Sequence, residues 1–188
     1  MTESRTLIIN EDIRVTEWSP DVFAYLRHID GYTNESLLES LDPEKNKDMV
    51  LKAGESQGKS GSFFIFSKDQ KFIIKTMTDS DFNAFKRIMK SYFQRVCTDR
   101  SCLFARIYGI YTIKMEGEAP VVLIVMGNSK SNATMIQGVF DLKGSMINRY
   151  CKPIPGKPFK PTATLKDKNL LKMNLKQKWL NFRMSDRN

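Results

Sequence analysis

Apolar residues recur at intervals of three and four near the N-terminus, which predicts two short helices. The first is expected to have Ser19 as its N-cap and Pro20 at its first helical position, and to end at Gly31. The second is expected to be capped by Asn34 and closed by Pro43, with its apolar positions at Leu37, Leu38 and Leu41. Helical structure is therefore predicted ahead of any sheet.

Two short apolar segments then predict a β-hairpin over residues 62–67 and 71–76, with a polar turn between them. A preceding strand is expected over residues 50–55. The stretch before the hairpin is rich in glycine and serine, and the second strand ends near Lys75. Flexible backbone N–H groups and an ammonium on one face of a hairpin suit nucleotide phosphates, so the pattern indicates a kinase-type nucleotide lid.

This lid has two competing interpretations. Gly58-Lys59-Ser60 looks like the end of a Walker A loop, but only three residues separate Gly54 from Gly58, where that motif has four. A Walker A loop also opens a helix, whereas Ser62 begins a β-rich segment. Spacing and context therefore exclude it. An ordinary hairpin turn that binds nothing remains the alternative for this stretch taken alone.

A longer helix and further strands follow. Thr78-Asp79 is expected to cap a helix over residues 80–96, whose apolar stripe is Phe82, Phe85, Ile88, Met89, Tyr92, Phe93 and Val96. A turn is expected at Gly117, and strands over residues 104–114, 121–126 and 138–142. The continuous apolar run at 121–126 is typical of a central strand buried on both faces. This order favours an α+β fold, with an antiparallel sheet and one long packed helix, as in a protein-kinase N-lobe.

Composition narrows the class of protein. The chain has 188 residues, 41% of them apolar, which suffices for one domain or one lobe of a larger one. No apolar run approaches the roughly 18 residues that cross a membrane, and the N-terminus lacks a signal-peptide pattern. Three cysteines without a CxxC pair and one histidine, His28, argue against a zinc site and favour free thiols in a reducing cytosol. We expect His28 to be structural, at or near the surface.

Basic charge is concentrated toward the C-terminus. Residues 1–140 hold 18 basic and 18 acidic side chains, whereas residues 141–188 hold 12 basic and 3 acidic ones and carry the whole net charge of +9. The four prolines within residues 151–162 predict a loop there, and residues 169–183 are predicted to form a basic helix. This asymmetry favours a polyanionic partner, such as anionic lipid, nucleic acid or nucleotide phosphates. A solvated basic tail without a partner is the alternative.

Several segments together resemble the phosphatidylinositol phosphate kinase family. The start of the match is an aromatic-x-Pro-x-x-Phe-x-x-x-Arg pattern that begins at Trp18 and ends at Arg27. The segment Phe140-Asp-Leu-Lys-Gly-Ser145 matches the signature of that family nearly letter for letter. The other matching segments are residues 58–64, 72–76, 108–128 and 164–167. The resemblance spans roughly residues 15–186 and implies a kinase-like fold of the phosphatidylinositol-4-phosphate 5-kinase type, of which this chain would be the N-terminal lobe.

The resemblance implies ATP-dependent phosphorylation of a phosphoinositide head group by an enzyme with a flat, basic, membrane-docking face. It implies that Lys75 pairs with the α- and β-phosphates of ATP. Met126 and Asn128 would lie against the adenine at the hinge. The residues that would cover the phosphates through backbone N–H groups are Gly58, Lys59, Ser60, Gly61 and Ser62.

The signature is expected to bind the lipid. Asp141 and Lys143 belong to it, and Arg149 lies six residues after Lys143. Lys143 and Arg149 match positions that the family uses against phosphate on the lipid head group. Arginine suits this task because its planar guanidinium binds phosphate oxygens in pairs.

This chain departs from the family pattern in three places. The long helix should offer a carboxylate to hold Lys75, usually glutamate, and the candidate here is the shorter Asp81, with Asn83 at a second position. Gly127 stands where an asparagine is usual. The catalytic loop of Met-Asp-Tyr-Ser type and the later metal-binding aspartate are missing, although Ser185-Asp186 resembles the run before that loop. We therefore expect no catalytic or metal-ligating residue in this chain, and negligible activity from the chain alone.

The resemblance divides the chain into a tail (1–14), a lipid-kinase N-lobe (15–150) and a basic proline-rich loop with the start of a C-lobe (151–188), truncated before the catalytic loop. One hypothesis is therefore a piece of a kinase that uses ATP and Mg²⁺. The other is a non-catalytic protein whose basic C-terminal segment binds anionic lipid or a kinase partner. Nucleic-acid binding has little support, because that segment has few aromatics and no RNP-like or helix-turn-helix pattern.

Location and assembly follow from the same resemblance. We expect a cytoplasmic protein, peripheral on the inner face of the plasma membrane or on other membranes that carry phosphoinositides. The two N-terminal helices resemble the part of the family that often mediates dimer contact, so a homodimer through the N-terminal region is one expectation.

Overall fold

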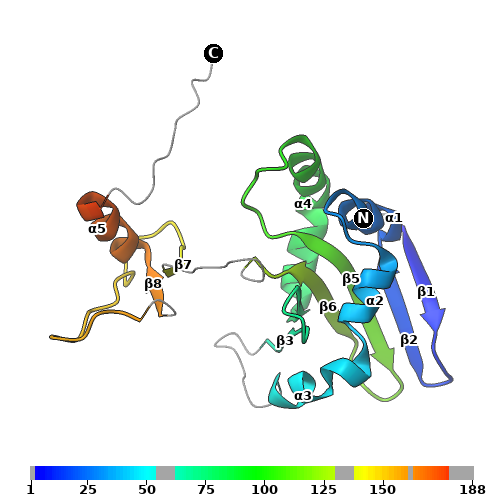
Figure 1. Ribbon diagram of the computed structural model, residues 1–188. Coiled ribbons are helices and arrows are strands. Elements are labelled where there is room, and N and C mark those ends of the chain that lie inside the picture. Colours follow the sequence, from blue (N-terminus) through cyan, green and yellow to red (C-terminus); the bar gives the residue numbers. More distant parts are fainter. Residues whose placement is uncertain (1–2, 54–61, 130–137, 161–162, 178–188) are drawn as a thin grey trace. The chain divides into compact units, whose positions relative to one another are not determined.

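The computed structural model describes residues 3–53, 62–129, 138–160 and 163–177 (Figure 1). The chain divides into two compact units, residues 1–132 and residues 133–188. Each unit has a sheet and at least one helix of its own. Among the helices described, none combines the length and the apolar character of a membrane-spanning segment.

The first unit is built on one antiparallel sheet of six strands, in the spatial order β1-β2-β5-β6-β4-β3. The predicted central strand is confirmed, because β6 lies inside the sheet between β5 and β4. The predicted hairpin is also confirmed, as β3 and β4. The strands are β1 (Ser4–Ile8), β2 (Ile13–Trp18), β3 (Phe64–Phe66), β4 (Phe72–Met77), β5 (Ile107–Met115) and β6 (Val121–Gly127).

Helices pack on both faces of this sheet. On one face, α1 (Pro20–Ile29) and α4 (Asp79–Thr98) form a core cluster with β5 and β6 that includes Phe23, Phe85 and Ile124. On the other face, Leu37 of α2 (Asn34–Ser40) packs with Phe72, Tyr108 and Val125. Ile124 and Val125 enter different clusters because successive side chains of a strand point to opposite faces. The predicted burial of this strand on both faces is thus confirmed.

The long helix matches its prediction closely. Thr78 is the N-cap of α4, and its Oγ1 accepts a hydrogen bond from the backbone N–H of Asp81 at 3.1 Å. Most of the predicted apolar stripe is buried or packed against the core, whereas Ile88 is 56% exposed. Gly117 has a φ of 77°, as expected for the turn between β5 and β6. His28 is exposed, as predicted.

The strand predicted over residues 50–55 is wrong, because α3 (Pro43–Ala53) covers its first four positions and the remaining two lie outside the described residues. Pro43 opens this helix, where a missing N–H costs nothing, and the carboxylate of Asp42 accepts a hydrogen bond from the backbone N–H of Glu44 at 2.9 Å. The valine and leucine that suggested a strand are therefore the last turn of a helix.

The predicted cap of the second helix is also wrong, whereas Ser19 and Pro20 begin α1 as predicted. Thr33, not Asn34, caps α2, in a capping box with Ser36. Asn34 instead accepts a hydrogen bond from Arg27. Ser19 occupies the N-cap position of α1, but its side chain forms no capping hydrogen bond. In addition, β1 and the first two residues of β2 lie within the segment that was expected to be a tail.

The second unit contains a parallel pair of strands, β7 (Val139–Asp141) and β8 (Thr164–Lys166), followed by α5 (Asp167–Gln177). The predicted strand over 138–142 corresponds to β7. The predicted helix over 169–183 corresponds to α5, which begins two residues earlier; residues 178–183 lie outside the described part. Residues 151–160 contain only an isolated bridge between Ile154 and Lys157, in agreement with the predicted loop.

Candidate functional site

Lys75 lies on β4, on the sheet face that carries α4. Residues two apart on a strand share a face, and Met77 packs into the cluster that α1 and α4 form with the sheet. The Cα of Lys75 is paired with Phe64 on β3 and with Ile124 on β6, so the lysine is flanked by a strand on each side. A lysine on an inner strand of an N-lobe sheet is the arrangement that protein kinases use to hold nucleotide phosphates.

The ammonium of Lys75 lies over an aromatic ring. Its Nζ is 5.3 Å from the centroid of the Phe64 ring. None of the ion pairs among the described residues includes Lys75. A partly exposed cation–π contact is weaker than a charge-assisted hydrogen bond to phosphate, so an anionic ligand could displace it.

Asp81, the predicted partner of Lys75, is exposed in the first turn of α4. A carboxylate in this position is stabilised by the positive end of the helix dipole. It is not within ion-pairing distance of Lys75 in the part of the chain that the structure describes. Beyond Asp81 the helix carries no acidic residue, and Asn83 is exposed as well. The structure therefore does not bring the predicted ion pair together.

The two predicted hinge residues lie together at the end of β6. Met126 packs against the same cluster as α4, and its Cα is paired with Ile73, which shares a face with Lys75. Asn128 donates hydrogen bonds from its backbone N–H to the carbonyl oxygen of Lys71 at 2.8 Å and from Nδ2 to that of Gln70 at 2.7 Å. Asn128 thus fastens the end of β6 to the turn between β3 and β4.

The predicted phosphate-covering segment falls mostly outside the described residues, which leave out Gly58, Lys59, Ser60 and Gly61. Its last member, Ser62, is buried. The next residue is fixed to β4, because the Phe63 N–H donates to Oγ1 of Thr76 at 3.0 Å and the Thr76 N–H donates to the Phe63 carbonyl at 3.1 Å. Phe63 therefore joins the sheet beside Lys75, and the role of residues 58–62 as a lid stays a prediction.

The signature residues of the second unit form a charge network. Nε of Arg149 donates to Oδ2 of Asp167 at 2.7 Å, and its Nη2 donates to the carbonyl oxygen of Asp141 and lies 3.5 Å from Oδ2 of that residue. Nζ of Lys143 lies 2.9 Å from Oδ1 of Asp141. The structure thus brings together the three predicted residues, Asp141, Lys143 and Arg149.

Asp167 is the centre of this network, although the sequence assigned it no role. Its Oδ1 accepts hydrogen bonds from the backbone N–H groups of Lys143 at 3.0 Å and Gly144 at 2.9 Å. The hydrogen bond from Arg149 and these backbone N–H groups lower the pKa of Asp167 to about 2. Its carboxylate, on a side chain that is 10% exposed, therefore fixes the backbone of the signature.

We expect this network to be lost at low pH. Because the pKa of Asp167 is lowered on folding, its ionised form stabilises the second unit above the unfolded value of about 3.9. That stabilisation disappears as the pH falls through about 2. NMR titration should show the backbone amide signals of Lys143 and Gly144 moving between about pH 4 and pH 2. Amide shifts that stay constant across this range would contradict the assignment.

Asn169 is a second residue that the sequence did not single out. It is 3% exposed, and its amide group makes two hydrogen bonds of 2.9 Å with the backbone of Cys151, one to the N–H and one to the carbonyl. This joins the start of the proline-rich loop to α5. The signal in the sequence that could have pointed to Asn169 was the 164–167 motif. It places Asp167 and then Asn169 at the predicted start of a basic helix.

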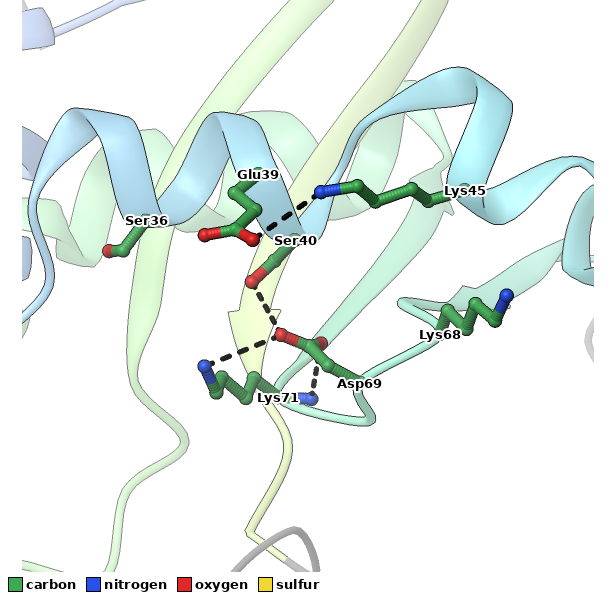
Figure 2. Close-up of a pocket in the computed structure, with 7 residues that line it drawn as sticks. All are labelled: Ser36, Glu39, Ser40, Lys45, Lys68, Asp69 and Lys71. Carbon is green, nitrogen blue, oxygen red and sulfur yellow. Dashed lines mark hydrogen bonds and ion pairs between the residues drawn. The ribbon is translucent and has the colours of Figure 1, made fainter.

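A pocket of about 320 Å³ lies between α2, the start of α3 and the turn of the hairpin (Figure 2). Asp69 accepts hydrogen bonds of 2.6 Å from the hydroxyls of both Ser40 and Ser67, and Lys71 lies 3.5 Å from it. These contacts lower the pKa of Asp69. Both carboxylates in the pocket are already paired. We therefore assign the contacts in this pocket to stabilising the hairpin turn. Its lining residues are Ser36, Glu39, Ser40, Lys45, Lys68, Asp69 and Lys71.

The described residues contain no group of three or more side chains that could bind a metal. The first unit instead presents a strand lysine, and the second an ordered basic loop; both suit phosphate groups.

Comparison with known sequences gives the family. The family described as phosphatidylinositol-4-phosphate 5-kinase matches residues 45–188. The chain therefore belongs to the phosphatidylinositol phosphate kinase family.

Individual relatives support this membership. The chain is 34% identical over 174 residues to phosphatidylinositol 4-phosphate 5-kinase 1 of Arabidopsis thaliana. This alignment covers 89% of the chain and 22% of the relative. It is 32% identical over 165 residues to a phosphatidylinositol 4-phosphate 5-kinase of Schizosaccharomyces pombe, with 87% and 21% covered. A probable phosphatidylinositol phosphate kinase of Dictyostelium discoideum is 34% identical over 134 residues, with 71% and 19% covered. The chain thus spans about a fifth of the length of these curated relatives.

Proposed function

We propose that this chain forms the nucleotide-binding lobe and the lipid-facing signature of an ATP-dependent phosphatidylinositol phosphate kinase. The observation that carries the proposal is the position of Lys75. It lies on an inner strand of a six-stranded antiparallel sheet, on the face that carries the long helix, with no carboxylate paired to it among the described residues. Family membership supports the choice of ATP as the anion.

In this proposal, ATP supplies the phosphoryl group and Lys75 positions it. The ammonium would leave the Phe64 ring and pair with the α- and β-phosphates. Met126 and Asn128, at the end of β6, would lie against the adenine, and residues 58–62 would cover the phosphates. A kinase also needs Mg²⁺, but the described residues contain no group of three or more side chains that could bind a metal, so we assign no Mg²⁺ ligand among them.

The lipid head group would meet the signature. Lys143 has a side chain that is 64% exposed, so it would contact a head-group phosphate directly. Arg149 is 12% exposed and holds both Asp141 and Asp167. For it to bind phosphate as well, it would have to give up one of these partners. We therefore assign Arg149 first to shaping the loop that presents Lys143.

A non-catalytic protein that binds anionic lipid or a kinase partner through residues 141–188 is the second candidate. The excess of 12 basic over 3 acidic side chains in this segment favours it. Both candidates would act at the cytoplasmic face of a membrane that carries phosphoinositides, and a homodimer through the N-terminal region remains a proposal under either. They differ in whether the chain binds nucleotide.

Replacing Lys75 by alanine should weaken ATP binding about ten- to a hundredfold, because a charge-assisted hydrogen bond contributes about 1.5–3 kcal/mol. Photolabelling of the intact chain with 8-azido-ATP, competed by ATP, measures this directly. Lys114→Ala is the matched control, since Lys114 is an exposed strand lysine on β5. Specific labelling that survives Lys75→Ala would contradict the role of the lysine. No labelling of the unaltered chain would favour the non-catalytic candidate.

A further inference from the structure

The second unit exposes a group of apolar side chains within one short loop. Leu142 and Met146 are each 53% exposed and Ile147 is 78% exposed. We call residues 142–148 the signature loop. Lys143, with a side chain that is 64% exposed, lies in the same loop. Several exposed apolar side chains within one short segment are a candidate for contact with a partner or a membrane.

The signature loop has a fixed backbone, so this exposure is a built feature. The Asp167 carboxylate holds the N–H groups of Lys143 and Gly144. Within the loop, the Ile147 N–H donates to Oγ of Ser145 at 3.2 Å. Directly after the loop, the carbonyl of Arg149 accepts a hydrogen bond from the N–H of Lys168 at 3.0 Å. Internal hydrogen bonds therefore hold the backbone that carries these apolar side chains.

The surroundings of the loop are cationic. In the described part of the second unit the acidic side chains are Asp141 and Asp167, and both are engaged by Lys143, Arg149 or loop N–H groups. Nζ of Lys166 donates to the carbonyl of Asn148 at 3.2 Å, which places a further ammonium at the end of the loop. The lysines of this unit without an acidic partner among the described residues include Lys152, Lys157 and Lys160.

We propose that the signature loop inserts Leu142, Met146 and Ile147 into the interface of an anionic bilayer, while Lys143 and Lys166 contact the head groups. Apolar side chains beside a basic surface are the combination that holds proteins in that interface. The inference rests on the proposed lipid-kinase function. It adds an apolar wedge, formed by these three side chains, that holds the loop at the membrane and does not itself recognise the phosphoinositide. The cationic surroundings favour the anionic bilayer over an apolar protein surface, which would leave these charges unpaired.

Co-sedimentation of the intact chain with vesicles of equal parts phosphatidylcholine and phosphatidylserine tests the wedge. The double variant Met146→Ser, Ile147→Ser should bind about tenfold more weakly or worse, because its polar side chains lose the transfer into the interface. Leu38→Ser is the matched control, since Leu38 is 72% exposed on α2 of the first unit. Circular dichroism of the variants checks that they fold. Binding equal to that of the unaltered chain would overturn the proposal.

A second variant tests insertion without removing the apolar surface. Ile147→Trp should keep vesicle binding and gain fluorescence that brominated phosphatidylcholine quenches, beyond the quenching seen for the native tryptophans. Absence of extra quenching would overturn the proposal. So would self-association of the unaltered chain in analytical ultracentrifugation that the double variant abolishes, because the apolar side chains would then meet a second copy.

The same measurements separate this inference from the proposed kinase function. Phosphatidylserine vesicles contain no phosphoinositide and no nucleotide, so the wedge is tested without either ligand. Adding phosphatidylinositol 4-phosphate should increase binding through Lys143, and Lys143→Ala should abolish that increase while much of the phosphatidylserine binding remains. A chain that inserts into the bilayer but is not labelled by 8-azido-ATP would refute the proposed kinase function alone. A chain that is labelled but does not insert would refute the wedge alone.

Discussion

Replacing Phe72 by alanine should lower the free energy of unfolding of the first unit by about 3–5 kcal/mol. Phe72 is 0% exposed, and its ring centroid lies 4.9 Å from that of Tyr32 and 5.7 Å from that of Tyr108. Its backbone also closes the hairpin, because its N–H donates to Oγ of Ser67 at 3.0 Å and its carbonyl accepts the Ser67 N–H at 3.0 Å. Truncation would therefore leave a cavity at the beginning of the strand that carries Lys75.

Urea denaturation followed by circular dichroism and by tryptophan fluorescence, to which Trp18 of the first unit contributes, measures the loss. Phe72→Leu is the control, since it keeps most of the apolar volume and should cost less than the alanine variant. Because Lys75 lies on the same strand, the alanine variant should also lose 8-azido-ATP labelling at urea concentrations that the leucine variant tolerates. An alanine variant as stable as the unaltered chain would show that this side of the sheet contributes little to the fold.

Replacing Asp167 by asparagine should release the backbone of the signature loop. Asparagine is nearly isosteric with aspartate, but it lacks the charge that pairs with Arg149 and keeps only one of the two acceptor oxygens. Hydrogen exchange at the amides of Lys143 and Gly144 should become about tenfold faster or more. If the proposed function holds, the variant should also bind phosphatidylinositol 4-phosphate vesicles more weakly, because the backbone that positions Lys143 and the apolar side chains is no longer fixed.

Asp141→Asn is the matched control for this effect. The Asp141 side chain is 41% exposed, against 10% for Asp167, and pairs with Lys143 and Arg149. Exposed ion pairs contribute little, so this variant should leave exchange at the two amides nearly unchanged. Equal effects of the two substitutions would indicate that the positive charges alone, and not the hydrogen bonds of Asp167, order the loop.

Much of the first unit follows from sequence periodicity. The apolar stripe of α4 has helical spacing, and the run at 121–126 has the continuous apolar character of an inner strand, so both were predictable from local pattern. Residues 50–53 were not, because Met49, Val50 and Leu51 fit a strand and a helix equally well. What decides between them is the start of α3 at Asp42 and Pro43, outside the apolar run. The strands β1 and β2 were missed because β1 is exposed throughout and has no buried face to produce a pattern.

The candidate site was predictable where a motif fixes it. The signature gave Asp141, Lys143 and Arg149, which the structure brings together. Asp167 was not assigned, since its partners lie 18 to 24 residues earlier and only the fold joins them. The expected ion pair between Lys75 and Asp81 is not formed, for the opposite reason. Asp81 is near in sequence, but its place in the capping turn of α4 leaves its carboxylate exposed.

The parallel pairing of β7 and β8 has a consequence for how the second unit folds. Parallel strands cannot be joined by a tight turn, so the chain must close a long connection, residues 142–163, before the two strands can pair. Four prolines lie in that connection, at positions 153, 155, 158 and 161. Each restricts the unfolded chain and reduces the conformational entropy that closure must remove. The prolines thus lower the entropic cost of pairing two strands of the second unit that lie far apart in the sequence.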